Sequence, residues 1–380
     1  MRRLAPIYLV NFFLSIHYAA VLYINSSNLL KYFSSNIVSL LFVLGAIGNI
    51  LLFIWAPRIL NKIGNQLLIF TFIVLEIFAV FGLAFFHSPL IVALVFLLHS
   101  SVVMMIYYCL DLFLEDVSED KNTGEIRGIN LTVVNVAIVA APLLVAFLTP
   151  DGDFTLLYYA SALLLVPSLF VVLFSFRKFE TSISRFKRSF FEFKLWLRSK
   201  NIRRVTNARF ILETFYTIMV IYTPIYLYNN IGFSWSEIGF IFVVMLLPFV
   251  LFELPAGELA DHWCGEKEIM TVGFFIMGMS LLVMPFLSKD IFTWMIVLFI
   301  SRIGASFVEI TSESFFFKHV WKSDTGLISI FRLTRPVSVI FGSVVGAICL
   351  LFLPFKALFL VLAILVFFGT QQSARLQDTR

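Results

Sequence analysis

The sequence predicts an all-α membrane protein with twelve transmembrane helices in two pseudo-symmetric bundles of six. Three observations predict this class: the length of the apolar segments, an internal repeat, and the distribution of Lys and Arg. Of the 380 residues, 60% are hydrophobic, only 13% are charged, and 46 are phenylalanine. A water-soluble protein of this size does not need so large an apolar fraction. The chain is therefore expected in a lipid bilayer.

The apolar segments have the length of spanning helices, which need about 20 mostly apolar residues. We expect helices at 6–28, 36–57, 67–87, 89–114, 128–149, 154–176, 206–228, 236–258, 268–288, 291–317, 326–352 and 354–373. The strands of a transmembrane barrel would instead alternate in polarity over about ten residues. The first apolar run follows two arginines, as in a secretory signal, but it is long and similar segments follow it. It is therefore interpreted as the first helix.

An internal repeat relates the two halves. The stretch "LDLFLEDVSEDKNTGEIRGINLT" at 110–132 aligns without a gap onto "SESFFFKHVWKSDTGLISIFRLT" at 312–334, at an offset of 202 residues. Both copies cover the end of the fourth helix of a half, a loop, and the start of the fifth helix. An even number of helices before the repeat gives the copies the same orientation, as in transporters built from parallel repeats.

Most of the 28 Lys and Arg residues fall in segments that share one side of the membrane with the N-terminus. This bias predicts that both termini are cytoplasmic. The net charge of +5 then reflects topology and lipid head groups, and no nucleic-acid partner is expected. We expect bundles at 1–176 and 206–380, joined by a basic amphipathic linker at 177–205. In that linker Phe186, Phe190, Phe193 and Trp196 form an apolar stripe suited to the membrane surface.

The stretch "GELADHWCGEKE", residues 257–268, is unusually rich in charge and follows the eighth helix. The equivalent stretch after the second helix is "APRILNKIGNQ". Here the chain resembles the major facilitator superfamily, whose signature at this place is Gly, three residues, Asp, a basic residue and a second Gly. The second copy keeps Gly257, Asp261 and Gly265, whereas the first has Asn61 in place of the Asp and keeps Gly64. No subfamily can be identified from these motifs.

The resemblance implies a twelve-helix fold and an inner gate in which this aspartate bridges the halves. A carboxylate can also accept hydrogen bonds from the positive N-terminus of a helix. Asp261 is therefore expected to meet the start of the fifth helix near Arg127, and the neutral Asn61 predicts an asymmetric gate. The alternative is that Asp261 is a solvated loop charge that only helps to set topology. Gly257 is expected to permit close contact between helices.

A second set of ionisable residues lies toward the inner ends of the tenth and eleventh helices. On the tenth helix Arg302, Glu309 and Glu313 share one face. Pairing of the two glutamates with the eleventh helix would make these residues structural, because charges inside membranes usually face a partner or a cavity. The expected charge cluster consists of Asp111, Glu309, Glu313, Arg332 and Arg335. For Glu76, alone in the third helix, the sequence suggests no role.

In this superfamily the first and fourth helices of each half line the central cavity. Near the midpoints of those helices the chain places six polar or ionisable residues: His17, Tyr18, His99, Glu213, Tyr216 and Arg302. We expect these residues to form a substrate or coupling site near the midplane, where such transporters bind their solutes. His17 or Glu213 would carry a coupling proton, and Arg302 would hold an anionic group. The competing interpretation is that these are buried side chains satisfied by neighbouring helices.

The expected function is secondary active transport of a small solute by alternating access, with proton coupling, by a monomer in the plasma membrane or bacterial inner membrane. The alternative is a transport-inactive membrane receptor, scaffold or chaperone of the same fold. No enzyme activity is expected, because the sequence has no phosphate-binding Gly-Lys-Ser/Thr loop and no His-Glu-x-x-His motif. Its three cysteines have no metal-ligand spacing, so no cofactor or metal is expected. Neither the solute nor the direction of transport can be inferred.

Overall fold

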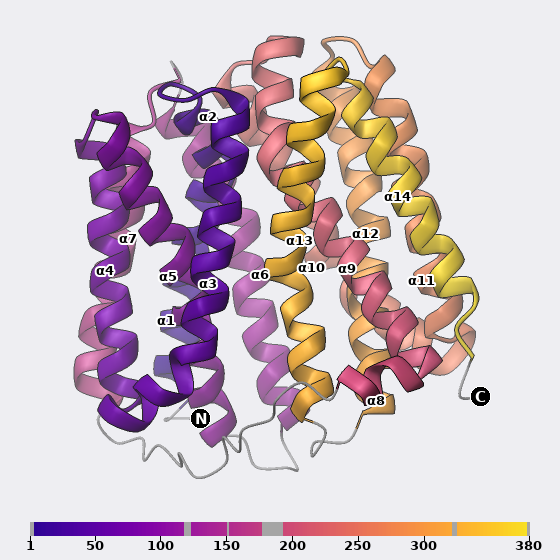
Figure 1. The fold of residues 1–380 in the computed structure, drawn as a ribbon, viewed down its shortest axis with the longest axis horizontal. Coiled ribbons are helices and arrows are strands. Elements are labelled where there is room, and N and C mark those ends of the chain that lie inside the picture. Colours follow the sequence, from indigo (N-terminus) through magenta and orange to yellow (C-terminus); the bar gives the residue numbers. More distant parts are fainter. Residues whose placement is uncertain (1–3, 118–122, 150–151, 177–192, 321–324, 378–380) are drawn as a thin grey trace. The chain divides into compact units, whose positions relative to one another are not determined.

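The computed structural model describes residues 4–117, 123–149, 152–176, 193–320 and 325–377 (Figure 1). All regular secondary structure in these ranges is helical. Twelve of the described helices are long and apolar enough to cross a membrane. The predicted fold class, an all-α membrane protein with twelve spanning helices, is therefore confirmed.

The helices follow one another with short connections. The first six spanning helices are α1 (Ala5–Leu22), α3 (Ser35–Ile63), α4 (Asn65–Phe85), α5 (Pro89–Val117), α6 (Thr123–Leu148) and α7 (Thr155–Ser175). The other six are α9 (Lys200–Ile225), α10 (Trp235–Leu259), α11 (Glu266–Val283), α12 (Ile291–His319), α13 (Thr325–Phe352) and α14 (Ala357–Ala374). The short helices α2 (Asn25–Leu29) and α8 (Phe193–Arg198) lie between them, and π-helical turns extend α9 over Tyr226–Ile231 and α10 over Ala260–Cys264. Helices satisfy their own backbone hydrogen bonds, as a bilayer requires.

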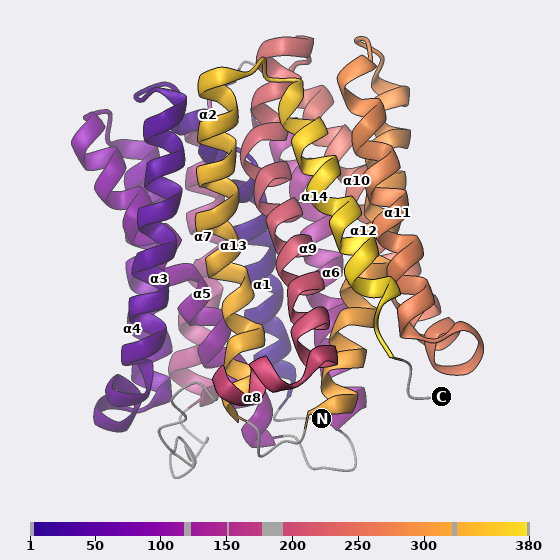
Figure 2. The same cartoon turned by 45° about the vertical axis from the view of Figure 1, so that its right-hand side comes forward.

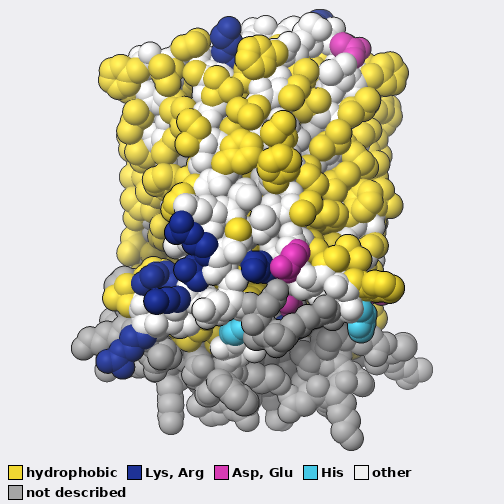
Figure 3. Space-filling view, turned by 90° about the vertical axis from the view of Figure 1, so that its right-hand side faces the viewer, with side chains coloured by type: hydrophobic (Ala, Val, Ile, Leu, Met, Phe, Trp, Pro, Cys, Tyr) yellow, Lys and Arg dark blue, Asp and Glu magenta, His cyan; other side chains and the backbone are white. Residues whose placement is uncertain are grey.

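The surface carries many large apolar side chains. Leu163, Phe174 and Phe292 are 68%, 70% and 71% exposed, respectively. On the face shown in Figure 3, hydrophobic side chains cover the middle, while Lys and Arg gather toward one end. Such a surface would be costly in water but is suited to contact with lipid.

The chain divides into two compact units, Met1–Lys187 with Ser234–Phe240, and Arg188–Phe233 with Ile241–Arg380. In the first unit α1 packs against α6 and α7, and α4 packs against α5 and α7. In the second unit α9 packs against α13 and α14, and α11 packs against α12 and α14 (Figure 2). These four helix pairings therefore recur at equivalent positions of the two units.

The helix boundaries follow the repeat that the sequence predicts. α5 spans residues 89–117 and α12 spans 291–319, so both ends differ by 202 residues. α6 begins at Thr123 and α13 at Thr325, again 202 residues apart. Before these helices, Gly64 and Gly265 end the loop copies with positive φ angles of 78° and 88°. Glycine suits both positions because it has no Cβ to clash in this backbone conformation.

The predicted linker, residues 177–205, lies only partly within the described chain. Residues 177–192 fall outside it, including Phe186 and Phe190 of the expected apolar stripe. Of the remainder, α8 contains Phe193 and a half-buried Trp196, and α9 begins at Lys200. The seventh spanning helix thus begins six residues before the predicted position, because polar residues at the end of the linker continue the helix.

Candidate functional site

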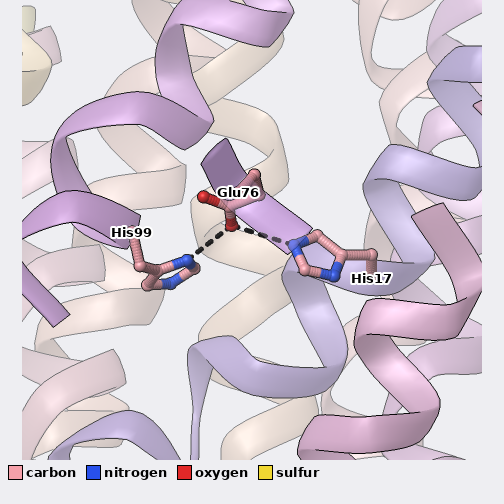
Figure 4. A group of neighbouring side chains, drawn as sticks. All are labelled: His17, Glu76 and His99. Carbon is pink, nitrogen blue, oxygen red and sulfur yellow. Dashed lines mark hydrogen bonds and ion pairs between the residues drawn. The ribbon is translucent and has the colours of Figure 1, made fainter. Parts of the chain in front are cut away.

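Glu76, for which the sequence suggests no role, binds two histidines in the interior of the first unit (Figure 4). Its Oε1 atom lies 3.0 Å from His17 Nε2 and 2.5 Å from His99 Nδ1. The three residues come from α1, α4 and α5 and are buried, with exposed fractions of 0%, 0% and 2% for His17, Glu76 and His99. The other carboxylate oxygen, Oε2, is buried and has no hydrogen-bond partner. We call these three residues the His-Glu-His cluster.

The contacts of His17 fix its tautomer. Its Nδ1 lies 3.0 Å from the backbone carbonyl oxygen of Ser161 on α7, and a carbonyl can only accept. The Ser161 hydroxyl lies 2.8 Å from the same nitrogen and 3.1 Å from the His17 carbonyl oxygen. A protonated Nδ1 satisfies all three groups, because the ring then donates to the Ser161 oxygens and the hydroxyl donates to the His17 carbonyl. A further proton must then lie between His17 Nε2 and Glu76 Oε1, since two lone pairs would otherwise face each other. One shared proton makes this pair electrically neutral, which suits its burial.

A second set of contacts supports His99. Its Nε2 lies 3.1 Å from the Asn25 side-chain amide nitrogen on α2, and the Asn25 amide oxygen accepts from the Tyr158 hydroxyl at 2.8 Å. With the amide nitrogen facing it, His99 Nε2 accepts and His99 Nδ1 donates to Glu76. Asn25 and Tyr158 are 4% and 1% exposed. The cluster is thus surrounded by a buried polar network rather than by solvent.

Tyr18, the other candidate on α1, contacts an aromatic residue of α5. Its ring packs edge-on against that of Tyr107 with the centroids 6.0 Å apart. The Tyr107 hydroxyl donates to Ser15 Oγ at 3.1 Å. Tyr18 is therefore part of an aromatic contact between α1 and α5.

The second unit contains a network in which one arginine serves two carboxylates. Arg209 Nη2 on α9 lies 2.8 Å from Glu213 Oε1, one turn along the same helix, and 3.3 Å from Glu309 Oε1 on α12. The Tyr216 hydroxyl donates to Glu309 Oε2 at 2.7 Å. The side chains of Glu213 and Glu309 are 7% and 27% exposed. We call these four residues the α9–α12 network.

Arg302 is buried against aromatic rings beside this network. Its exposed fraction is 1%. Its guanidinium carbon lies 4.7 Å from the centroid of the Phe215 ring and 5.8 Å from that of Tyr216. Rings in this position attract a cation through their electron-rich faces. The guanidinium is therefore held beside the tyrosine that bonds Glu309.

Five of the six cavity candidates thus fall into two groups. The structure joins His17 to His99 through Glu76, and Tyr216 to Arg302 through a cation–π contact. Glu213 joins the second group through Arg209. Sequence reasoning missed both connecting residues. The i, i+4 spacing of Arg209 and Glu213 was an available signal for one of them, and the isolation of Glu76 in an apolar helix was a signal for the other.

The residues of the predicted inner gate are described only in part. The side chains of Asp261 and Arg127 lie outside the description, so their expected contact stays a prediction. Asn61 is exposed at the end of α3. A Cβ added to Gly257 would meet Ile310 Cγ1 at 3.5 Å, an ordinary contact distance, so the close helix contact expected at this glycine is not present.

The expected charge cluster separates into a network member and more peripheral residues. Glu309 pairs with Arg209 on α9 and accepts from Tyr216, whereas pairing was expected with α13. The helical phase of α12 turns this carboxylate toward α9, which the sequence did not define. The other members lie nearer the surface: Asp111 is half-buried, and Glu313, Arg332 and Arg335 are exposed.

Twelve spanning helices, four helix pairings shared by the two units, and ionisable side chains buried within both define a multi-pass membrane protein with the plan of transporters built from parallel repeats. Residues 205–371 match the family model of the Major Facilitator Superfamily. This part of the chain, which contains the second loop motif, is therefore similar to the major facilitator superfamily.

A solved structure shows the same fold. A crystal structure of a mutant of the nucleoside transporter NupG is similar with a TM-score of 0.77 and 15% sequence identity, over 97% of this chain and 99% of that chain. No curated protein sequence matches the chain significantly. The chain is thus a multi-pass membrane protein whose fold is that of NupG.

Proposed function

We propose that this protein is a proton-coupled secondary active transporter that moves a small polar solute by alternating access. The observation that carries the proposal is the sharing of Arg209 between Glu213 and Glu309. Three ionisable side chains on two spanning helices are costly to keep in a membrane and usually serve a function. Their arrangement supports a change of partner when a proton binds.

A proton and Arg209 compete for the same carboxylates. When Glu309 is ionised, Arg209 is held between two negative groups. Protonation of Glu309 removes one attraction and leaves Arg209 paired with Glu213 alone. Because Arg209 and Glu309 lie on different helices, proton binding weakens the contact between α9 and α12. Such a change in a packed interface is a physical basis for coupling proton binding to helix movement.

Accessibility favours the α9–α12 network over the His-Glu-His cluster as the coupling site. Glu309 is 27% exposed, so protons and water can reach it. Glu76 and His17 are both 0% exposed. A coupling group must exchange its proton with water during each transport cycle. We therefore assign coupling to Glu309 and Glu213, and not to His17.

Arg302 and Tyr216 provide polar groups for a solute beside the coupling carboxylates. The buried Arg302 guanidinium suits an anionic or strongly accepting group, and the ring faces of Phe215 and Tyr216 suit a planar one. NupG is a nucleoside transporter. Nucleosides are therefore the first solutes to test. We place the protein in the plasma or bacterial inner membrane, as a monomer with both termini cytoplasmic, on the basis of its Lys and Arg distribution.

The test is uptake into vesicles containing the purified protein, with and without a pH gradient. A thermal-shift screen first selects the nucleoside or other solute that stabilises the protein by binding. An imposed pH gradient should drive accumulation of that solute by the wild-type protein. Glu309→Gln should retain solute exchange but lose accumulation driven by the gradient. Glu268→Gln, at an exposed position in the first turn of α11, is the matched control and should behave as wild type.

Two outcomes would contradict the proposal. Accumulation that stays pH-driven in both Glu309→Gln and Glu213→Gln would remove the coupling role of the α9–α12 network. Failure of every solute to exchange in either direction would favour a receptor or scaffold instead.

A further inference from the structure

We propose that the His-Glu-His cluster is a binding site for one divalent transition-metal ion of the Zn²⁺ and Co²⁺ type. The potential ligand atoms of His17, Glu76 and His99 all lie within 4.8 Å of one another. They come from three different spanning helices, so one ion would join α1, α4 and α5. This site is independent of the solute and proton pathway proposed for the second unit.

The types of donor atom select the class of metal. Two imidazole nitrogens and one carboxylate oxygen suit Zn²⁺, Co²⁺ and related first-row ions. Ca²⁺ and Mg²⁺ prefer sites made entirely of oxygen atoms. Three protein ligands also leave a fourth position for water, as in many zinc sites. The buried Oε2 atom of Glu76, which has no hydrogen-bond partner, is a further acceptor available to a cation.

Neighbouring residues orient both histidines in the way that is usual for histidine ligands of metal ions. A ligating histidine usually donates its other ring N–H to a carbonyl or carboxylate. His17 does this, because its Nδ1 faces the Ser161 carbonyl at 3.0 Å and leaves Nε2 for the ion. His99 would ligate through Nδ1, and its Nε2–H then needs an acceptor. A half-turn of the Asn25 amide places Oδ1 in that position, 3.1 Å from the ring nitrogen where the amide nitrogen now lies.

The ion would replace a proton. The shared proton between His17 and Glu76 must leave before Nε2 and Oε1 can both bind metal. Ligand atoms around a tetrahedral Zn²⁺ lie about 3.3 Å apart, given bonds of about 2.0–2.1 Å. The present separations of 3.0 Å and 2.5 Å must therefore widen by less than about 1 Å. Rotation about the flexible Glu76 side chain widens these two contacts, and small rotations of the histidines would adjust the spacing of their nitrogens, which is within 4.8 Å.

The site can be tested on purified, untagged, full-length protein stripped of metal with a chelator. The incubation with Co²⁺ must be long because the cluster is buried. We then expect one tightly bound ion per chain with the visible absorption of four-coordinate cobalt. Zn²⁺ should displace it, whereas Mg²⁺ should not. Affinity should fall as the pH is lowered, because protons compete with the metal for the same ligand atoms.

Substitutions of the proposed ligands test where the metal ion binds. Glu76→Gln and His99→Gln should each weaken binding by more than about 100-fold, since loss of even a supporting partner costs about 10- to 100-fold. His87→Gln, at an exposed histidine between α4 and α5, controls for adventitious surface binding and should bind as wild type.

The wild-type protein alone can overturn the proposal, so it does not depend on the folding of any variant. Absence of bound Co²⁺ after incubation, or cobalt with the spectrum of an all-oxygen six-coordinate ion, would show that the cluster holds only protons. Binding that survives in both Glu76→Gln and His99→Gln would place the metal elsewhere. Either result leaves the transport proposal unaffected.

Discussion

Replacement of Gly273 by alanine should destabilise the second unit, because α11 and α12 are in close contact at this residue. A Cβ added to Gly273 would lie 2.6 Å from the Gly304 carbonyl oxygen and 2.9 Å from Val308 Cγ2. A carbon and a carbonyl oxygen normally stay about 3.3 Å apart. The helices must therefore separate by about 0.7 Å along that contact. Gly304 O is a backbone atom, so a side-chain rotation cannot relieve the clash.

The magnitude follows from two opposing contributions. Overpacking of a close contact costs about 1–3 kcal/mol, and a rigid backbone obstacle favours the upper part of that range. Alanine recovers about 0.5–1 kcal/mol because it restricts the unfolded chain more than glycine does. The net loss is about 2 kcal/mol, which corresponds to a decrease in Tm of about 4–8 °C for a unit of this size.

Thermal unfolding of purified protein in detergent, followed by intrinsic fluorescence at one heating rate, measures this change. Gly257→Ala is the matched control, because its added Cβ would meet only Ile310 Cγ1, at 3.5 Å. The control should unfold at the wild-type temperature or slightly above it. If Gly273→Ala unfolds at the same temperature as Gly257→Ala or higher, the reasoning from close helix contact is wrong.

Three further predictions concern charge and backbone conformation. Arg209→Met leaves Glu213 and Glu309 without their shared cation, so it should lower the free energy of unfolding by about 3–5 kcal/mol. Adding Glu213→Gln and Glu309→Gln to this variant should restore most of the loss, as measured by thermal melting. Asp290 caps α12, and its hydrogen bonds to Thr293 in the first turn lower the carboxyl pKa. The wild-type protein should therefore melt at a higher temperature than Asp290→Asn near neutral pH. This difference should disappear as the pH falls below about 4 and then through the lowered pKa. Gly265→Ala should cost about 1–2 kcal/mol in the same melting assay, because the φ of 88° strains any residue with a Cβ, and an unchanged Tm would show that the loop relaxes freely.

The twelve helices could be predicted because their signal is local. A segment of about 20 apolar residues has few alternatives to a spanning helix. The repeat was equally accessible, since Thr123 and Thr325 begin equivalent helices at the predicted offset. The break between α1 and the short helix α2 was missed, because the predicted helix at 6–28 covers both, whereas α1 ends at Leu22 and α2 spans Asn25–Leu29. Its asparagine is buried against His99, and such tertiary burial has no local sequence signature.

The candidate sites were less predictable because they depend on how each helix is rotated about its axis. Helix midpoints drew attention to His17 and His99, but they did not show that Glu76 joins them. Likewise Glu309 was recognised as membrane-embedded, yet its partner on α9 depends on a rotation that hydropathy does not fix when most faces are apolar. Long-range pairs of this kind require either a structure or an aligned family.

The π-helical turn at Ala260–Cys264 has a consequence for how this loop tolerates changes in length. Gly257 and Pro57 are 200 residues apart, whereas Gly265 and Gly64 are 201 apart, so the second loop has one residue more than the first. A π turn accommodates one added residue within a helix. In α3 the equivalent segment is α-helical up to Ile63, and both loops still end at a glycine of similar conformation. The turn thus accommodates the insertion within the loop, and α11 still begins directly after its glycine, as α4 does. Trp263, within the π turn, is 78% exposed.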